Sequence, residues 1–332
     1  MRRKFQKIVT LGIFFLVLGI VFLSQQLLPS NALALDEATM QLHWKVSGMH
    51  VPFIVAWDKG FFKDEGIDMT VKEGAGSSAT IKLMAAGKAT FGMAGTNVNV
   101  KGIARGMPVI QVAQIEASKK YCLLSKPETG IKTPQDLIGK IVAGSGSGGV
   151  SALFNAFLAI NNIPKEKVTF LNAGRARLEA MATDKAHATL GLGMDDPVRL
   201  QGMGVKSPQV MLFRDWGLPV IGDGVIVNTK TVKENPDLIR RFIKAFIKGI
   251  NYTFMDIDGA ADIAVKRFPM AKKEILVDQL GKLRWLFPPP LGYQDPKGIE
   301  EIRDITAKYE GITEAENIPL NKLYTNEFIP KY

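Results

Sequence analysis

Three short loops place hydroxyl or amide side chains directly after a glycine: Gly76-Ser77-Ser78, Gly95-Thr96-Asn97 and Gly146-Ser147-Gly148. Each follows a predicted strand and precedes a predicted helix, so free backbone N–H groups and the positive helix end point at one spot. Such a spot suits an anionic or polar ligand. The same residues are also ordinary helix caps, so any one loop has a structural explanation. Three loops together indicate a ligand site, because strand ends in open α/β sheets meet at one crevice.

Several common chemistries are excluded by the residues present. The chain has one cysteine, Cys122, so it cannot form an internal disulfide framework or a cysteine-rich metal site. Its three histidines, His43, His50 and His187, lack the spacing of a zinc-binding HExxH helix. No P-loop motif occurs, and the glycine-rich stretch around Gly146 has glycine where a hydrolase needs serine. We therefore expect no metal, no cofactor and no catalytic residue.

A few single residues suggest what the ligand is. Trp44 could stack on a flat ligand and His50 could hydrogen-bond to it, although Trp44 could equally be core and His50 a helix cap. Asp195 could accept a hydrogen bond from an amino or cationic group. A site for nitrate or sulfonate should avoid buried carboxylates, so Trp44 and Asp195 favour a flat, nitrogen-containing molecule. Trp216 and Asp223 fit packing or a turn as well as they fit ligand contact. A small anion is the alternative ligand.

Short apolar runs alternate with amphipathic stretches along the chain, which is typical of α/β domains. The composition changes near Pro127 and again near Gly222, and a mainly helical region follows. The expected strands cover Gln41–Val46, Asp68–Lys72, Phe91–Ala94, Val109–Gln114 and Lys140–Ala143, and the expected helices cover Pro52–Phe62, Ala79–Ala86, Val150–Asn161 and Asp237–Met255. The alternation of strands and helices continues over Val168–Leu171, Leu178–Thr183, Ala188–Leu190 and Gln209–Phe213.

The amino terminus has the three parts of a secretory signal: a basic start with Arg2 and Lys7, an apolar run over Ile8–Leu23, and the cleavage sequence Ala32-Leu33-Ala34. We expect residues 1–34 to be removed during export to the periplasm. An uncleaved membrane anchor is the alternative, since the run approaches the length of about 17 residues that can span a bilayer.

The charge of the mature chain is mild. The 332 residues carry a net charge of +10, and the four basic residues of the signal leave 38 basic against 32 acidic residues, a net charge of +6. No cluster of Lys and Arg is interleaved with aromatic residues, so we expect no nucleic-acid partner.

The stretch Trp44–Gly66, WKVSGMHVPFIVAWDKGFFKDEG, closely resembles the opening of the family that binds thiamine-pyrimidine precursors. That family lies within the wider nitrate, sulfonate and taurine binding proteins of ABC importers. Shorter pieces similar to the same family follow in the same order, and the resemblance spans most of residues 41–255. These pieces are Gly74–Ser78, Ala86–Lys88, Phe91–Met93, Gly106–Val109 and Ile131–Lys140.

This resemblance implies the α/β fold of a type II periplasmic binding protein, with two α/β lobes, a ligand cleft between them and a hinge of two segments. Lobe one would comprise residues 35–126 plus 225–332, and lobe two residues 127–224. The implied function is capture of a small molecule, such as a thiamine pyrimidine precursor, and its delivery to an ABC permease with a cytoplasmic ATPase. We expect a monomer whose ligand contacts come from Trp44, His50, Ser77, Ser78, Thr96, Asn97, Ser147 and Asp195.

Two other functional classes share this fold. Some relatives are enzymes that make the thiamine pyrimidine with an active-site histidine and a cysteine-rich motif, and His50 matches that histidine. The cysteine-rich motif is absent, since Cys122 stands alone, and an export signal is present, so we expect no enzyme. A receptor subunit that senses a ligand and signals to a membrane partner is the other class.

Export can be tested directly. Because Ala32-Leu33-Ala34 offers the small side chains that the signal peptidase pocket requires, amino-terminal sequencing of exported protein should return Leu35 as the first residue. A sequence that begins at Met1 would instead show an uncleaved anchor.

Overall fold

The computed structural model describes residues 35–116, 121–146, 149–193, 196–218, 221–284, 287 and 289–331. Leu35–Tyr332 forms one compact unit. The predicted export signal lies outside the described residues. Within the described part, the helices include none that is long and apolar enough to cross a membrane.

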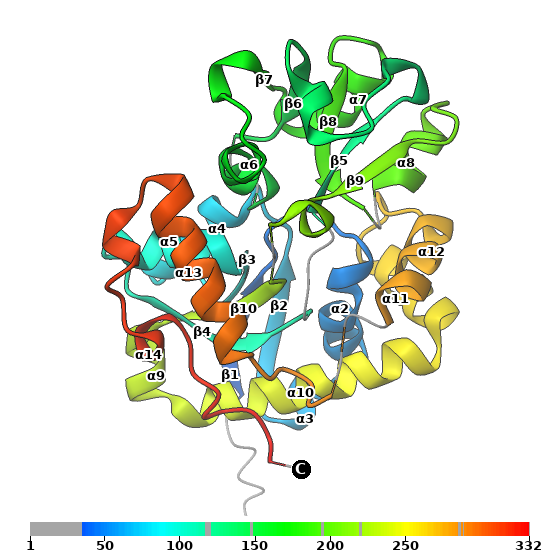
Figure 1. Ribbon diagram of the computed structural model, residues 1–332. Coiled ribbons are helices and arrows are strands. Elements are labelled where there is room, and N and C mark those ends of the chain that lie inside the picture. Colours follow the sequence, from blue (N-terminus) through cyan, green and yellow to red (C-terminus); the bar gives the residue numbers. More distant parts are fainter. Residues whose placement is uncertain are drawn as a thin grey trace, which may run out of the picture. The chain divides into compact units, whose positions relative to one another are not determined.

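The first of two β-sheets is built mainly from the amino-terminal part of this unit. Its strand order is β2-β1-β3-β10-β4, and β10 enters from much later in the chain, antiparallel to both of its neighbours (Figure 1). We call this sheet and its helices the first lobe. Its strands are β1 (Asp36–Gln41), β2 (Ile67–Lys72), β3 (Phe91–Gly95), β4 (Val109–Gln114) and β10 (Asp223–Asn228), and its early helices are α2 (Val51–Asp58), α3 (Phe61–Asp64), α4 (Ser77–Ala85) and α5 (Thr96–Ala104).

The second sheet has the order β7-β6-β8-β5-β9, and with its helices it forms the second lobe. Here β5 is the strand that runs against its neighbours. The chain therefore passes between the sheets twice, after β4 and after β9. The strands are β5 (Tyr121–Ser125), β6 (Ile141–Gly144), β7 (Thr169–Asn172), β8 (Ala188–Leu192) and β9 (Gln209–Leu212), and the helices are α6 (Gly149–Ile160), α7 (Arg177–Ala182) and α8 (Asp196–Gly202).

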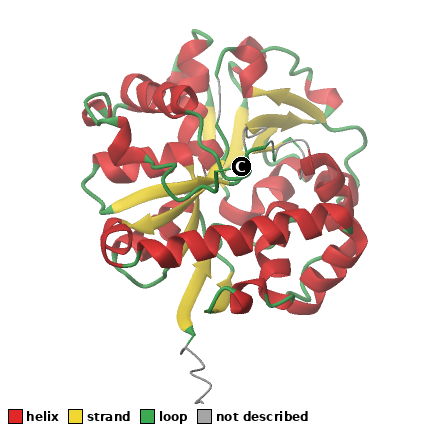
Figure 2. Cartoon of the chain, turned by 90° about the horizontal axis from the view of Figure 1, so that it is seen from below, coloured by secondary structure: helices red, strands yellow, loops and turns green. Residues whose placement is uncertain are grey.

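The core of the first lobe centres on the long helix α10 (Pro236–Met255), which crosses the bottom of Figure 1 and lies in front when the molecule is viewed from below (Figure 2). Its apolar residues recur every three or four positions, so one face of the helix is continuously buried. Phe242 on that face stacks on Phe91 of β3, with ring centroids 3.7 Å apart, and Phe246 stacks on Phe53 of α2 at 4.1 Å.

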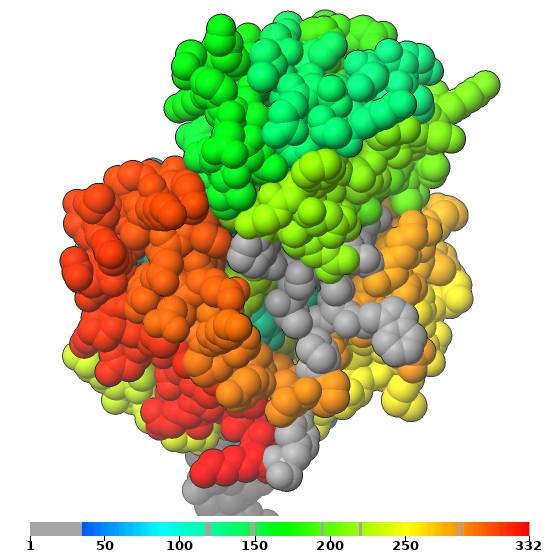
Figure 3. All heavy atoms as spheres, viewed as in Figure 1, coloured from blue at the N-terminus to red at the C-terminus, as the bar shows by residue number. Residues whose placement is uncertain are grey.

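Among the remaining carboxyl-terminal helices, α13 contacts both lobes. Helix α13 contributes Ile299, Ile302 and Ile305 to the apolar core that Leu153 and Phe157 of α6 form in the second lobe. In Figure 3 the green residues of the second lobe rest on the orange residues of this region. These helices are α9 (Thr229–Glu234), α11 (Ile257–Arg267), α12 (Lys273–Leu283), α13 (Pro296–Glu310) and α14 (Leu320–Leu323).

Most predicted elements are confirmed, but the first strand is not. The sequence predicted a strand over Gln41–Val46, whereas β1 ends at Gln41, because its ladder with β2 runs from Asp36 to that residue. Beyond the ladder, the His43 and Trp44 carbonyls accept hydrogen bonds from the N–H groups of Gly76 and Gly74 instead of from a strand. The stretch after Gln41 is therefore a loop at the sheet edge.

The sequence does not predict β5 and β10. These are the strands that follow the two crossings of the chain between the sheets. Residues 121–125 pair in the second sheet, although the sequence assigned them to lobe one, and residues 223–224 pair in the first sheet, although the sequence assigned them to lobe two. The predicted lobe boundaries at 126 and 225 stay a prediction.

Truncating Phe242 should be costly, because the ring is fully buried between Phe91 and Phe62. We expect Phe242→Ala to lower the free energy of unfolding by about 3–5 kcal/mol in urea denaturation. The matched control is Phe170→Ala, where the ring is 41% exposed and the expected loss is about 1 kcal/mol or less. Equal losses in the two variants would contradict this account of the core.

Candidate ligand-binding site between the lobes

The carboxyl ends of β1, β2, β3 and β4 and the amino end of β10 share one edge of the first sheet. In the second sheet, the carboxyl ends of β6, β7 and β8 share an edge with the amino end of β5. Tyr121 at that end of β5 pairs with Leu192, yet its hydroxyl lies 3.2 Å from the position of a Cβ on Gly95, the last residue of β3. The two edges therefore face each other, where the crevice of an α/β sheet is expected.

Three polar side chains converge over the end of β3. A Cβ added to Gly95 would lie 2.9 Å from Asn97 Oδ1, 3.2 Å from the Tyr121 hydroxyl and 3.5 Å from Asp223 Oδ1. All three side chains are buried, and they come from α5, β5 and β10. Glycine at position 95 leaves the space in which these groups meet, because any side chain there would collide with Asn97.

A chain of hydrogen bonds leads to Asp223 through two histidines. The Ser47 N–H donates to His50 Nδ1 at 3.0 Å, which places the His50 proton on Nε2. His50 Nε2 lies 3.2 Å from His43 Nδ1 and donates to it. The remaining His43 proton, on Nε2, then faces Asp223 Oδ2 at 3.4 Å. His50 therefore orients the His43 ring, and His43 presents its Nε2–H group to the Asp223 carboxylate.

Trp44 follows directly in the loop after β1. That loop lies close against the turn that follows β2, because a Cβ on Gly74 would lie 2.0 Å from the Leu42 carbonyl oxygen. Trp44 is half-buried, and the guanidinium carbon of Arg175, which comes from the second lobe, lies 5.6 Å from the centroid of its ring. This is a cation–π contact between the lobes. We call His43, Trp44, Asn97, Tyr121, Arg175 and Asp223 the interlobe site.

The predicted hydroxyl residues lie at the same edge with different surroundings. Ser77 is buried, and its Oγ accepts a hydrogen bond from the Gly95 N–H at 3.1 Å. Thr96 is buried, and its Oγ1 lies 2.7 Å from the Gly222 carbonyl oxygen and 3.1 Å from Gln111 Oε1. Ser78 is half-buried in the first turn of α4. Ser147 and Asp195 lie outside the described residues. All of these stay predictions as ligand contacts.

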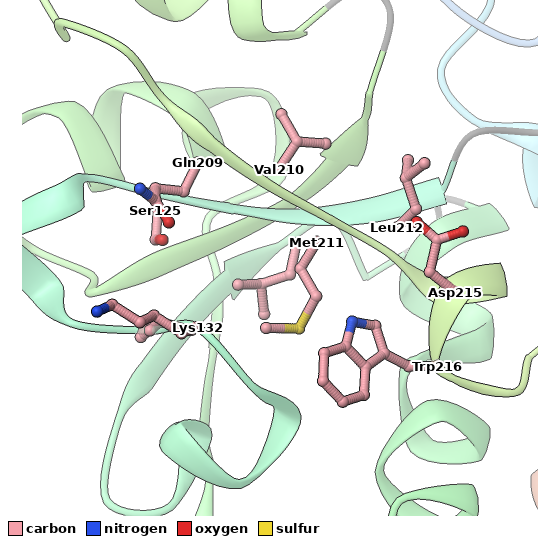
Figure 4. A pocket seen from close by; sticks show the side chains of 10 residues that line it. Ser125, Lys132, Gln209, Val210, Met211, Leu212, Asp215 and Trp216 are labelled. Carbon is pink, nitrogen blue, oxygen red and sulfur yellow. The ribbon is translucent and has the colours of Figure 1, made fainter.

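A separate pocket lies in the second lobe, on strands β5 and β9 (Figure 4). Leu123 and Met211 belong to its apolar floor, and Lys132, Asp215 and Trp216 lie around it. Its lining includes no interlobe-site residue, so a ligand in it would not contact both lobes there. Among the described residues, no group of three or more His, Cys, Asp or Glu side chains could hold a metal ion.

Comparison with known proteins identifies the family. A family model described as NMT1/THI5 like matches residues 47–260, which is more than half of the chain. The chain belongs to the NMT1/THI5-like family. This confirms the resemblance carried by Trp44–Gly66, most of which lies inside the matched region.

Relatives of this NMT1/THI5-like protein include both binding proteins and enzymes. It is 26% identical over 318 residues to the riboflavin-binding protein RibY of Chloroflexus aurantiacus, covering 91% of this chain and 88% of RibY. It is 26% identical over 240 residues to 4-amino-5-hydroxymethyl-2-methylpyrimidine phosphate synthase THI11 of Saccharomyces cerevisiae, covering 67% of this chain and 68% of that enzyme.

Solved structures show the fold. The periplasmic aliphatic sulphonate binding protein SsuA of Escherichia coli superposes with a TM-score of 0.70 at 14% identity, over 89% of this chain and 99% of SsuA. The two α/β lobes expected from the sequence are therefore confirmed as a periplasmic binding protein fold, the fold of substrate-binding proteins of ABC importers.

Sequence reasoning missed several residues of the interlobe site. The sequence does not point to Tyr121 or Arg175, and it does not decide whether Asp223 belongs to a turn or contacts a ligand. Local sequence around Tyr121 carries no site pattern, since its role depends on reaching Gly95 in the other lobe. Arg175 had a usable signal, because it closely follows the end of β7 on the edge where ligands bind.

Thr96 offers a test of the internal bonds at this edge. We expect Thr96→Val to lower the free energy of unfolding by about 1–3 kcal/mol, because the buried Gly222 carbonyl, 2.7 Å from the Thr96 hydroxyl, loses its donor. Thr96→Ser keeps the hydroxyl and should stay close to the parent protein. A Val variant as stable as the Ser variant in urea unfolding would rule out this structural role.

Proposed function

We propose that this protein is an extracytoplasmic solute-binding protein that captures a flat, nitrogen-containing molecule and delivers it to an ABC importer. The observation that carries the proposal is that the loop after β1 carries both Trp44 and His43, the residue that faces the buried carboxylate of Asp223. Trp44 supplies an aromatic plane on which a ring can stack. Asp223, oriented by His43, supplies an acceptor for a ring N–H or amino group.

Asn97 and Tyr121 complete the recognition of such a ring. An amide offers both donors and acceptors, and a phenol hydroxyl can act as either, so together they suit the mixed polar edge of a heterocycle. Because Tyr121 comes from the second lobe, a ligand that contacts it and Trp44 stabilises the closed arrangement of the lobes. Capture by closure then presents the loaded protein, as a monomer, to the permease and its ATPase.

The relatives support a heterocyclic ligand. RibY is named as a binder of riboflavin, which is a flat nitrogen heterocycle, and the yeast relative is named for the pyrimidine phosphate that it makes. A thiamine pyrimidine precursor fits the same description. From the predicted signal over residues 1–34 we infer a location in the periplasm or, if the signal stays uncut, at the outer face of the membrane.

A small anion such as an alkanesulfonate or nitrate is the second candidate. The fold shared with SsuA and the hydroxyl residues Ser77, Ser78 and Thr96 favour it. The buried carboxylate of Asp223 opposes it, because an anion beside that group would meet a like charge.

The enzyme alternative rests on His50, and the geometry gives that residue another role. His50 is 1% exposed, and both of its ring nitrogens have protein partners, Ser47 and His43. Cys122 lies in an apolar cluster with Leu124 and Leu178. We therefore propose binding without turnover.

Purified protein incubated with pyridoxal phosphate and iron should form no pyrimidine. Single-turnover pyrimidine formation that His50→Ala abolishes would overturn the proposal.

Ligand binding can be screened by thermal shift with riboflavin, an aminopyrimidine, an alkanesulfonate and nitrate. A true ligand at 100 times its dissociation constant should stabilise the folded protein by about 2.7 kcal/mol. We expect a heterocycle to bind, and Trp44→Ala to weaken that binding by about 1–3 kcal/mol through the loss of stacking. Asp223→Asn should weaken it as well, because the amide is a poorer acceptor than the carboxylate.

Trp57→Ala is the matched control for the stacking residue. Trp57 lies in α2 and also has an arginine, Arg267, over its ring at 4.3 Å, but it is not part of the interlobe site. Its substitution should leave affinity unchanged. If Trp44→Ala and Asp223→Asn both bind the screened ligand as tightly as the parent protein, the heterocycle model fails, and binding of the alkanesulfonate would establish the anion model.

A further inference from the structure

We propose that the second lobe holds an anion subsite, formed by Arg175 and Arg177, so that the captured ring carries a phosphate, sulfonate or carboxylate substituent. The inference rests on the proposed function, because it describes the second half of the same ligand. The first lobe would bind the ring, and the second lobe would bind its charged group.

Arg177 provides the first observation. It opens helix α7 and is 9% exposed, and its Nη2 donates to Asp196 Oδ2 at 2.7 Å. Its Nη1 is buried and has no hydrogen-bond partner among the residues that the structure describes. A buried guanidinium donor without a partner is costly and therefore requires an explanation. An anionic oxygen of the ligand would supply the missing acceptor.

The position of Arg177 connects it to the interlobe site. Its partner Asp196 also accepts a hydrogen bond from the Leu192 N–H, through the same Oδ2 and at 2.8 Å. Leu192 ends β8 and is the residue that pairs with Tyr121. The guanidinium thus lies at the carboxyl edge of the second sheet, which faces the first lobe.

The local charge balance is positive. Asp196 is shared between Arg177 and Arg199, whose Nη1 lies 3.3 Å from the other carboxylate oxygen. Arg175, two residues before Arg177, is exposed and forms no ion pair within the described part of the chain. Asp196 therefore pairs with two guanidinium groups, and Arg175 adds a positive charge that no described carboxylate pairs with. Such an excess attracts an anion.

Arg175 links this charge to the ring platform, since its guanidinium carbon lies 5.6 Å from the Trp44 ring centroid. A ring stacked on Trp44 would replace this cation–π contact and place its substituent beside the displaced guanidinium. The planar fork of arginine matches the two oxygens of a phosphate, sulfonate or carboxylate. A ligand with both parts would be bound by both lobes, whereas a neutral ring lacks the second set of contacts.

The test compares matched ligands by calorimetry: riboflavin with riboflavin 5′-phosphate, and 4-amino-5-hydroxymethyl-2-methylpyrimidine with its phosphate. We expect the phosphate form of the preferred ring to bind at least about tenfold more tightly, as charge-assisted hydrogen bonds predict. Arg175→Gln should remove most of that preference, because it should weaken binding of the phosphate form far more than binding of the neutral form. Arg177→Lys keeps a positive charge beside Asp196 but lacks the second nitrogen donor of the guanidinium. This variant should therefore also reduce the preference for the phosphate form.

Arg199→Gln is the matched control, because Arg199 contacts the opposite oxygen of Asp196 and is not part of the proposed subsite. It should keep the preference for phosphate, and the melting temperature of each variant shows whether it folds. If the neutral form binds as tightly as the phosphate, or if the preference survives in Arg175→Gln, the anion subsite is wrong and the proposed function stands. If neither form of either ring binds, the proposed function fails and the subsite with it.

Discussion

The insertion of β10 between β3 and β4 is the constraint on which the rest of the structure depends. A buried amide network holds it there: Gln114 Nε2 donates to the Asp223 carbonyl at 2.7 Å, and Gln111 Nε2 donates to Gln114 Oε1 at 3.1 Å. Gly224 makes room for this network, because a Cβ there would collide with the Gln111 amide. Buried amides of this kind are costly unless they are satisfied, so the strand has one well-defined register.

That register fixes the chemistry of the interlobe site. It brings Asp223 opposite Gly95 at the sheet edge, where the carboxylate faces His43. It also places β10, where the chain returns from the second lobe, beside β4, where the chain leaves the first lobe. Tyr121 therefore reaches the end of β3 from the other sheet. The contact between the lobes and the position of the proposed ligand acceptor, Asp223, both follow from one strand insertion.

The two lobes present different chemistry to the space between them. The first lobe offers Trp44, Asn97 and the carboxylate of Asp223, which suit a polar aromatic ring. The second lobe offers the guanidinium groups of Arg175 and Arg177, which suit an anion. Under the two proposals, the first lobe holds the ring of the ligand and the second lobe holds its charged group.

The sequence alone determined many of the local elements and the family. Hydrophobic periodicity placed β2, β4 and α10 correctly, and Trp44–Gly66 carried a family pattern, because both signals lie within a few consecutive residues. Only the tertiary structure decided that β10 enters the first sheet and that Tyr121, Arg175 and Asp223 meet near Trp44. These residues come from segments far apart in the chain, and their convergence depends on strand pairing and buried hydrogen bonds that no local pattern encodes.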